Sequence, residues 1–223
     1  GGAGGGGPGS WVEDAVADSG SQAEVLVLAE SIPHPLTDDA AETDPHWWHD
    51  PRNASAAARA IAESLGTDAK AYIRRIEALD ARIASCFDSI PAEQRRIVTD
   101  HDAFASLAER YAIDIVGAVI PALTTEAQPS AGELAELRDT IEREGVRAVF
   151  PEASVPSELA DAIAQETGAS AEYELYGDSL GSAGSPGQTY LGMLAANADS
   201  LMLGMTGGER GCEPAVRLAE GGG

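Results

Sequence analysis

The sequence predicts an α/β fold in which helices cover both faces of a parallel sheet. From residue 96 onward, short runs rich in Val and Ile alternate with longer Ala- and Glu-rich runs of helical periodicity, a pattern typical of β-α-β units. Before them, residues 68–89 carry one apolar stripe at spacings of three and four, which predicts a helix of about 20 residues, or ~30 Å. Hydrophobic residues make up 43% of the 223-residue chain, enough for an ordinary globular core.

The first third of the chain predicts two helices, a strand and a long loop. Residues 11–17 (WVEDAVA) predict a short helix. The compact apolar run 24–29 (EVLVLA) is bounded by polar residues and predicts a buried strand. In the polar loop that follows, two prolines restrict the backbone of the segment 44–51, DPHWWHDP. Residues 53–65 are rich in Ala and predict a helix that ends at a glycine.

The long helix and the alternating region complete the expected elements. The stripe of the helix, which begins near residue 67 or 68, consists of Tyr72, Ile76, Leu79, Ile83 and Phe87. The expected strands are 96–99, 113–119, 146–150 and a weak one at 172–175. The expected helices are 103–111, 130–144, 157–166 and 189–204. Ser130 followed by Glu133 is the pattern of a capping box, which marks the start of its helix.

Both ends of the chain are rich in glycine. The first ten residues, GGAGGGGPGS, resemble a flexible linker or the ragged start of a truncated product, and no signal peptide is visible. Residues 207–223 are weakly patterned, so we expect a flexible tail. Because Cys86 lies in the long helix and Cys212 in this tail, we expect no structural disulfide.

The charge of the chain excludes several classes of partner. The formal net charge is −23, and such a polyanion repels the phosphate backbone of nucleic acids and the anionic surface of a membrane leaflet. No apolar run approaches the roughly 20 residues that span a bilayer. The motifs of serine hydrolases and of nucleotide-binding loops are also missing from the sequence, which argues against these functions.

Three polar residues follow expected strands at the point where each strand ends. His101 comes after RIVT, Glu152 after VRAVF, and Asp178 shortly after EYEL. Because the carboxyl ends of parallel strands meet at one edge of a sheet, these residues are expected to lie close together. Imidazole and carboxylate groups suit Zn²⁺, Mn²⁺ and Fe²⁺. Each residue also has a structural role as the alternative to metal binding. In that alternative His101 is a polar residue at a helix N-terminus that hydrogen-bonds the backbone, and Asp178 is a turn residue. Glu152 then supplies a negative charge that is favourable near the N-terminus of the helix that follows it.

The segment DPHWWHDP is a second candidate. His46 and His49 are three residues apart, and at least one of them is a candidate metal ligand. A zincin-type site on a helix is not supported, because the prolines disfavour a regular helix and the glutamate of that motif is missing. The alternative is an aromatic-rich loop that packs Trp47 and Trp48 against the rest of the protein.

The order of the motifs resembles a known family. DPHWWHDPRNA, VTDHDAF, VRAVFPEASV, LYGDSLG and GQTYLGMLAANADSLMLG occur in the order found in the metal-binding solute-binding proteins of zinc and manganese ABC importers, the cluster A-I or ZnuA/TroA-like proteins. The resemblance implies two α/β lobes with parallel sheets flanked by helices, joined by a single long helix, with the metal between them. It divides the chain into a partial N-terminal lobe (1–66), the linking helix (67–89), a C-terminal lobe (90–206) and the tail.

The resemblance also implies roles for individual residues. His46, His101 and Asp178 correspond to metal ligands, and Glu152 to a residue that orients a ligand or bridges the lobes. A histidine at position 101 favours Zn²⁺ over Mn²⁺. His49 stands where the family often has leucine and is expected not to bind the metal. Family members carry another histidine earlier in the first lobe, so the resemblance implies that the chain is N-terminally truncated and that water fills the open position; His34 is a weaker substitute.

The implied function is capture of a divalent metal ion and delivery to the membrane permease of an ABC transporter, without enzymatic activity. The implied location is extracytoplasmic, in the periplasm or at the cell surface, with a lipid anchor in the full-length protein, and the implied state is a monomer. Two alternatives remain open from the sequence. One is a surface adhesin; the other is a zinc-dependent hydrolase that would use Glu152 as its general base.

Overall fold

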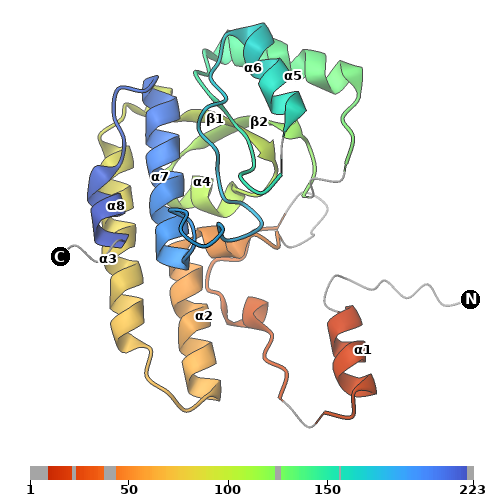
Figure 1. The fold of residues 1–223 in the computed structure, drawn as a ribbon, viewed down its shortest axis with the longest axis vertical. Coiled ribbons are helices and arrows are strands. Elements are labelled where there is room, and N and C mark those ends of the chain that lie inside the picture. Colours follow the sequence, from red (N-terminus) through yellow and green to blue (C-terminus); the bar gives the residue numbers. More distant parts are fainter. Residues whose placement is uncertain (1–9, 22–23, 38–43, 124–126, 156, 220–223) are drawn as a thin grey trace, which may run out of the picture.

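The computed structural model describes residues 10–21, 24–37, 44–123, 127–155 and 157–219. The Gly-rich start at residues 1–9 lies outside this part of the chain. The predicted fold class is confirmed: a parallel sheet is flanked by helices, and one long helix leads from the N-terminal part to the sheet (Figure 1). Within the described residues the N-terminal part contains helices and loops but no strand, so the structure has one sheet rather than the two implied by the resemblance.

The first elements are the helix α1 (Ser10–Asp18) and the short 3-10 helix η1 (Leu28–Ser31). The expected helix is confirmed, but the expected buried strand at 24–29 is wrong. Val25, Leu26 and Val27 are exposed by 47%, 38% and 39%. A buried strand needs a neighbour that pairs with its backbone and covers its side chains. No strand of the described residues pairs with this segment.

The next elements are η2 (Trp47–His49), α2 (Pro51–Ser64) and the long helix α3 (Lys70–Asp88). The carboxylate of Asp50 caps α2 by accepting the backbone N–H of Arg52, and a proline occupies its first turn. Along α3, Ile76, Leu79, Ile83 and Phe87 are buried as expected. The stripe begins with Ile73 instead of Tyr72, which is 40% exposed.

Three parallel strands form the sheet, in the order β2-β1-β3. The strands are β1 (Arg96–His101), β2 (Asp114–Ile120) and β3 (Val149–Phe150). The accompanying helices are α4 (Ala105–Tyr111), α5 (Ala131–Glu144), α6 (Glu158–Thr167) and α7 (Tyr190–Thr206). The weak strand expected at 172–175 makes only a single bridge, Leu175 with Glu152. A second bridge just before it, Ser170 with Ala148, also keeps the chain along the edge of the sheet.

Neighbouring side chains of each strand enter two separate cores, because they point to opposite faces of the sheet. Val98 and Val149 pack with side chains of α5 and α6 on one face. Ile97 and Phe150 face the larger core, which is built by α3, α4 and α7. Figure 1 shows α7 lying beside α3 on this side, and the two helices are in contact. The larger core therefore joins the long helix to the sheet.

The end of the chain differs from the expected flexible tail. Residues Glu213–Ala219 form a further helix, α8, which contacts both α3 and α7. Cys212 is fully buried and forms a disulfide bond with Cys86, so the expectation of no structural disulfide is wrong. The reason is tertiary: α7 packs beside α3, and the segment after α7 places the Cα atom of Cys212 5.8 Å from that of Cys86, 126 positions earlier.

None of the helices in the described part of the chain is long and apolar enough to span a lipid bilayer.

The capping box predicted at the start of α5 is confirmed and supports a measurable stability effect. The Ser130 side chain accepts the N–H of Glu133, and the Glu133 carboxylate accepts the N–H of Ser130. We expect Ser130→Ala to lower the free energy of unfolding by about 1 kcal/mol, because one N–H of the first turn loses its partner. Urea unfolding followed by circular dichroism measures this difference. Replacing the exposed Ser182 by alanine is the control, and equal stability of the two variants would contradict the prediction.

Candidate metal centre

The structure brings together three of the side chains that the sequence singled out. His46 lies in the loop before η2, His101 is the last residue of β1, and Asp178 follows the bridge at Leu175. Each offers one ligand atom, and these atoms lie within 4.8 Å of one another. The Asp178 Oδ1 is 3.3 Å from His46 Nε2 and 3.2 Å from His101 Nε2. Two imidazoles and one carboxylate therefore converge on a single point.

The three donors differ in their access to solvent. His46 is 4% exposed and His101 is fully buried, whereas the Asp178 side chain is 41% exposed. The imidazoles are thus fixed within the protein, and the carboxylate closes the cluster on its solvent side. Such an arrangement gives an ion a route to the cluster past Asp178.

The orientation of the His46 ring is set by Asp44. The Asp44 Oδ1 accepts the backbone N–H of His46 at 2.9 Å and its Nδ1–H at 2.8 Å. The opposite ring nitrogen, Nε2, then carries the lone pair and faces Asp178. A carboxylate behind a histidine is the usual partner that orients such a ring toward a metal. Sequence reasoning missed Asp44, although an acidic residue two positions before the histidine was a usable signal.

His101 sits between several acidic groups. Its Nδ1 is 3.8 Å from Asp100 Oδ2, and its Nε2 is 3.2 Å from Asp178 Oδ1. Burial alone lowers the pKa of His101, but the nearby carboxylates of Asp100, Asp178 and Glu152 outweigh it and raise the pKa. The same electrostatic surroundings that hold a proton on the ring also favour a divalent cation next to it.

Glu152 does not join the three converging donors, and its carboxylate instead supports the chain beside Asp178. Its Oε2 accepts the backbone N–H of Gly177 at 2.9 Å, and its Oε1 accepts the Ser154 hydroxyl at 3.0 Å. Burial raises the pKa of Glu152, while the hydrogen bonds from Ser154 and Gly177 act against this shift. The side chain thus holds the backbone immediately before Asp178.

The remaining histidines lie outside the cluster. His34 is exposed, and its backbone pairs with the side chain of Asn53. His49 is fully buried against the ring of Phe104, and its Nε2 is 3.1 Å from the Gly177 carbonyl oxygen. Burial, together with the neighbouring His46, lowers the pKa of His49 to about 3, so the ring is neutral at physiological pH.

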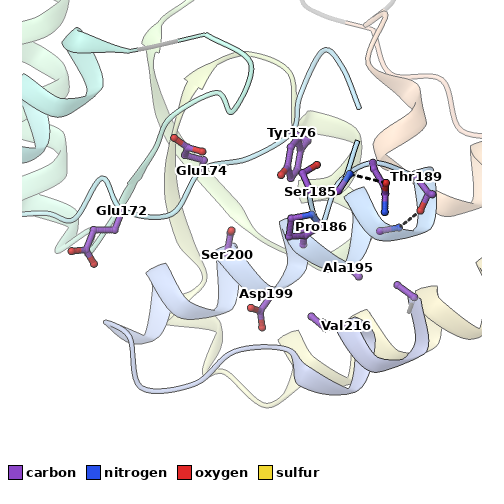
Figure 2. Close-up of a pocket in the computed structure, with 15 residues that line it drawn as sticks. Glu172, Glu174, Tyr176, Ser185, Pro186, Thr189, Ala195, Asp199, Ser200 and Val216 are labelled. Atoms are coloured by element: carbon purple, nitrogen blue, oxygen red, sulfur yellow. Dashed lines mark hydrogen bonds between the residues drawn. The ribbon is translucent and has the colours of Figure 1, made fainter. Parts of the chain in front are cut away.

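A separate cavity lies elsewhere on the molecule. It has a volume of about 710 Å³, and none of the three converging side chains lines it. Figure 2 shows the segment with Glu172, Glu174 and Tyr176 on one side of it, and Asp199 of α7 and Val216 of α8 on the other. The candidate metal centre is thus a small cluster of donors rather than a large pocket.

The fold and the donor set define a class: α/β proteins that present nitrogen and oxygen ligands at the carboxyl edge of a parallel sheet. The chain belongs to the ZnuA family, because the family model described as "Zinc-uptake complex component A periplasmic" matches residues 3–203.

Curated relatives and a solved structure agree with this membership. The zinc-binding protein TroA of Treponema pallidum is 30% identical over 199 residues, which cover 81% of this chain and 64% of TroA. The manganese-binding lipoprotein MntA of Halalkalibacterium halodurans is 26% identical, over 88% of this chain and 68% of MntA. The periplasmic zinc-binding protein TroA structure from Treponema pallidum superimposes with a TM-score of 0.76 and 28% identity, covering 88% of this chain and 77% of that chain. The chain spans less than two thirds of the length of the TroA relative.

Proposed function

We propose that this protein captures a divalent metal ion outside the cytoplasm and delivers it to the membrane permease of an ABC importer. The observation that carries the proposal is the convergence of His46, His101 and Asp178, whose ligand atoms lie within 4.8 Å of one another. Two neutral imidazoles and one ionised carboxylate are ligands that first-row divalent cations accept. In this proposal all three side chains bind the ion, and Asp44 and Glu152 hold the ligands in place.

Zn²⁺ is the favoured ion, with Mn²⁺ as the second candidate. Zn²⁺ readily accepts imidazole nitrogens as ligands, whereas Mn²⁺ typically occupies sites that are richer in oxygen. A site with two imidazoles therefore favours Zn²⁺. The names of the relatives support either ion, since TroA is named for zinc and MntA for manganese. Three protein ligands leave at least one coordination position for water or for a further group.

The buried disulfide supports the proposed location. Disulfides persist in oxidising compartments such as the periplasm and the cell surface, and are rare in the cytosol. Cys86 and Cys212 form such a bond within the core. The family model is described as periplasmic, and MntA is named a lipoprotein. We therefore propose that the protein acts outside the cytoplasm, as a lipid-anchored monomer.

A hydrolytic function finds no support in the site. A zinc hydrolase would need a free general base beside the metal, and Glu152 was the candidate. Its two oxygens accept hydrogen bonds from Gly177 and Ser154 and are therefore engaged in holding the backbone. The family consists of solute-binding proteins, which is consistent with a binding function.

Calorimetric titration of the metal-free, disulfide-intact protein with Zn²⁺ and with Mn²⁺ tests the proposal. We expect about one ion per chain, because the three donors share one point. The double variant His46→Ala/His101→Ala should bind no ion at the candidate centre. His34→Ala is the matched control, because it removes an exposed imidazole outside the cluster and should leave binding unchanged. Equal binding by the double variant and the unmodified protein would refute the assignment.

A further inference from the structure

The backbone of Gly177 is held on both sides by residues distant in the sequence. Its N–H donates to Glu152 Oε2 at 2.9 Å. Its carbonyl oxygen accepts two hydrogen bonds, one from Trp48 Nε1 and one from His49 Nε2, each at 3.1 Å. Trp48 and His49 precede Gly177 by 129 and 128 positions. The loop that carries His46 is therefore bonded directly to the residue before Asp178.

The space around Gly177 is filled to contact. A Cβ atom at this position would collide with Glu152 Oε2 and would lie 3.4 Å from both His101 Cε1 and a ring atom of Phe104. Glycine is thus required for the Glu152 carboxylate to reach the backbone. The N–H and the carbonyl of Gly177 belong to the two consecutive peptide groups that meet at its Cα atom. Because both groups are bonded, this stretch of backbone has little freedom to rotate, and Asp178 follows it directly.

The protonation state of His49 follows from its partner. A carbonyl oxygen can only accept, so the Nε2 of His49 must carry a hydrogen. The other ring nitrogen, Nδ1, is buried and has no hydrogen-bond partner among the residues that the structure describes. An apolar side chain of similar size would fill this space next to Phe104 without leaving a buried acceptor unpaired. The bond to Gly177 is therefore the contact that distinguishes histidine from an apolar residue here.

Tyr190 of α7 reinforces the same connection, since its hydroxyl donates to the Trp48 carbonyl at 2.8 Å. Three hydrogen bonds thus tie residues 48 and 49 to Gly177 and α7, and each of them bridges well over a hundred positions of the chain. His46 lies at the start of the tied loop and Asp178 at the end of the tied peptide. The distance of 3.3 Å between His46 Nε2 and Asp178 Oδ1 is thus supported by hydrogen bonds within the protein, none of which involves a metal ion.

We propose that His49 is a positioning residue of the metal centre: its N–H to the Gly177 carbonyl holds Asp178 at the distance at which it can share one ion with His46 and His101. This inference rests on the proposed function. His49 does not touch the ion; it acts through the Gly177 peptide. Trp48 performs the same role from the neighbouring position, so the two donors share the task.

Three variants separate positioning from packing. His49→Leu introduces an apolar side chain of similar size and removes the N–H that donates to the Gly177 carbonyl. His49→Gln restores an N–H donor, and Trp48→Phe removes the second donor of the same carbonyl. Zn²⁺ affinity is measured by competition with a chelating dye, the ligand geometry by the visible absorption of bound Co²⁺, and the stability of each metal-free variant by urea unfolding.

We expect His49→Leu to bind Zn²⁺ about 10- to 100-fold more weakly, the range typical for residues that orient metal ligands. Its Co²⁺ spectrum should shift, while the metal-free variant should be as stable as the unmodified protein or more stable, because the unpaired Nδ1 is gone. His49→Gln should recover most of the affinity and the original spectrum. Trp48→Phe should show a smaller loss of affinity in the same direction.

Two results would overturn the inference. One is an unchanged affinity and Co²⁺ spectrum in His49→Leu. The other is an equal loss of affinity in His49→Leu and His49→Gln together with equal destabilisation of both metal-free proteins, which assigns His49 to packing. Failure of the proposed function is recognised separately, because the unmodified protein would then bind neither Zn²⁺ nor Co²⁺, or the His46→Ala/His101→Ala variant would bind them equally well.

Discussion

Reduction of the Cys86–Cys212 bond is expected to lower the free energy of unfolding by about 4 kcal/mol, because a cross-link across about 100 residues strongly restricts the unfolded chain. The two cysteines are 126 positions apart and join the end of α3 to the start of α8. The bond encloses the sheet, the helices α4 to α7 and two of the three converging donors, His101 and Asp178. Its loss therefore acts on the whole sheet domain and not on the tail alone.

Urea unfolding in the presence and absence of a thiol-free reductant measures this effect, and mass spectrometry after alkylation of free thiols verifies the state of the cysteines. The double variant Cys86→Ala/Cys212→Ala should be destabilised to a similar extent and should no longer respond to the reductant. That variant is the control for effects of the reductant itself. A midpoint of unfolding that is the same with and without reductant in the unmodified protein would disprove the prediction.

Replacement of Asp178 by alanine is expected to weaken Zn²⁺ binding more than 100-fold, beyond the roughly 10- to 100-fold typical of residues that only orient ligands. Asp178 supplies the carboxylate among the three converging donors, and its Oδ1 lies within 3.3 Å of both imidazoles. Without it, two neutral rings remain to hold a doubly charged ion. Because its side chain is 41% exposed, the metal-free protein should lose no more than about 1 kcal/mol of stability.

Titration with Zn²⁺ and urea unfolding of the metal-free protein measure the two effects separately. Asp178→Asn serves as the matched comparison, because it keeps the shape and one oxygen but removes the charge, and its affinity should fall between those of the alanine variant and the unmodified protein. Unfolding of Asp178→Ala in the absence of metal would mean that Asp178 is needed for the fold. Retention of full affinity in both variants would remove Asp178 from the proposed site.

The three converging donors were predictable for two different reasons. His101 follows a clear strand, and the rule that ligands gather at the carboxyl ends of parallel strands places it at the edge of the sheet. Asp178 follows a segment that forms single bridges, which still bring it to the same edge. His46 lies in an irregular loop where periodicity gives no direction, and the resemblance of DPHWWHDP to a known family supplied its assignment.

Local pattern failed wherever a contact between distant segments decided the outcome. The run EVLVLA is apolar and compact, yet it is exposed in the described structure because no strand pairs with it. Cys86 and Cys212 gave no sign of their bond, since their proximity depends on how α7 packs along α3. The sequence also showed no sign of the hydrogen bond between His49 and the Gly177 carbonyl, because these residues are 128 positions apart and meet only where the loop reaches the edge of the sheet.

By itself, the sequence determined the helices α1 to α7, the parallel order of strand and helix after residue 96, and the capping box at Ser130, because periodicity and caps are properties of neighbouring residues. The tertiary structure alone decided the disulfide, the exposure of residues 25–27, and the hydrogen bonds that fix the backbone before Asp178. These features join positions that are far apart along the chain, and only the packing of helices on the sheet brings such positions within bonding distance.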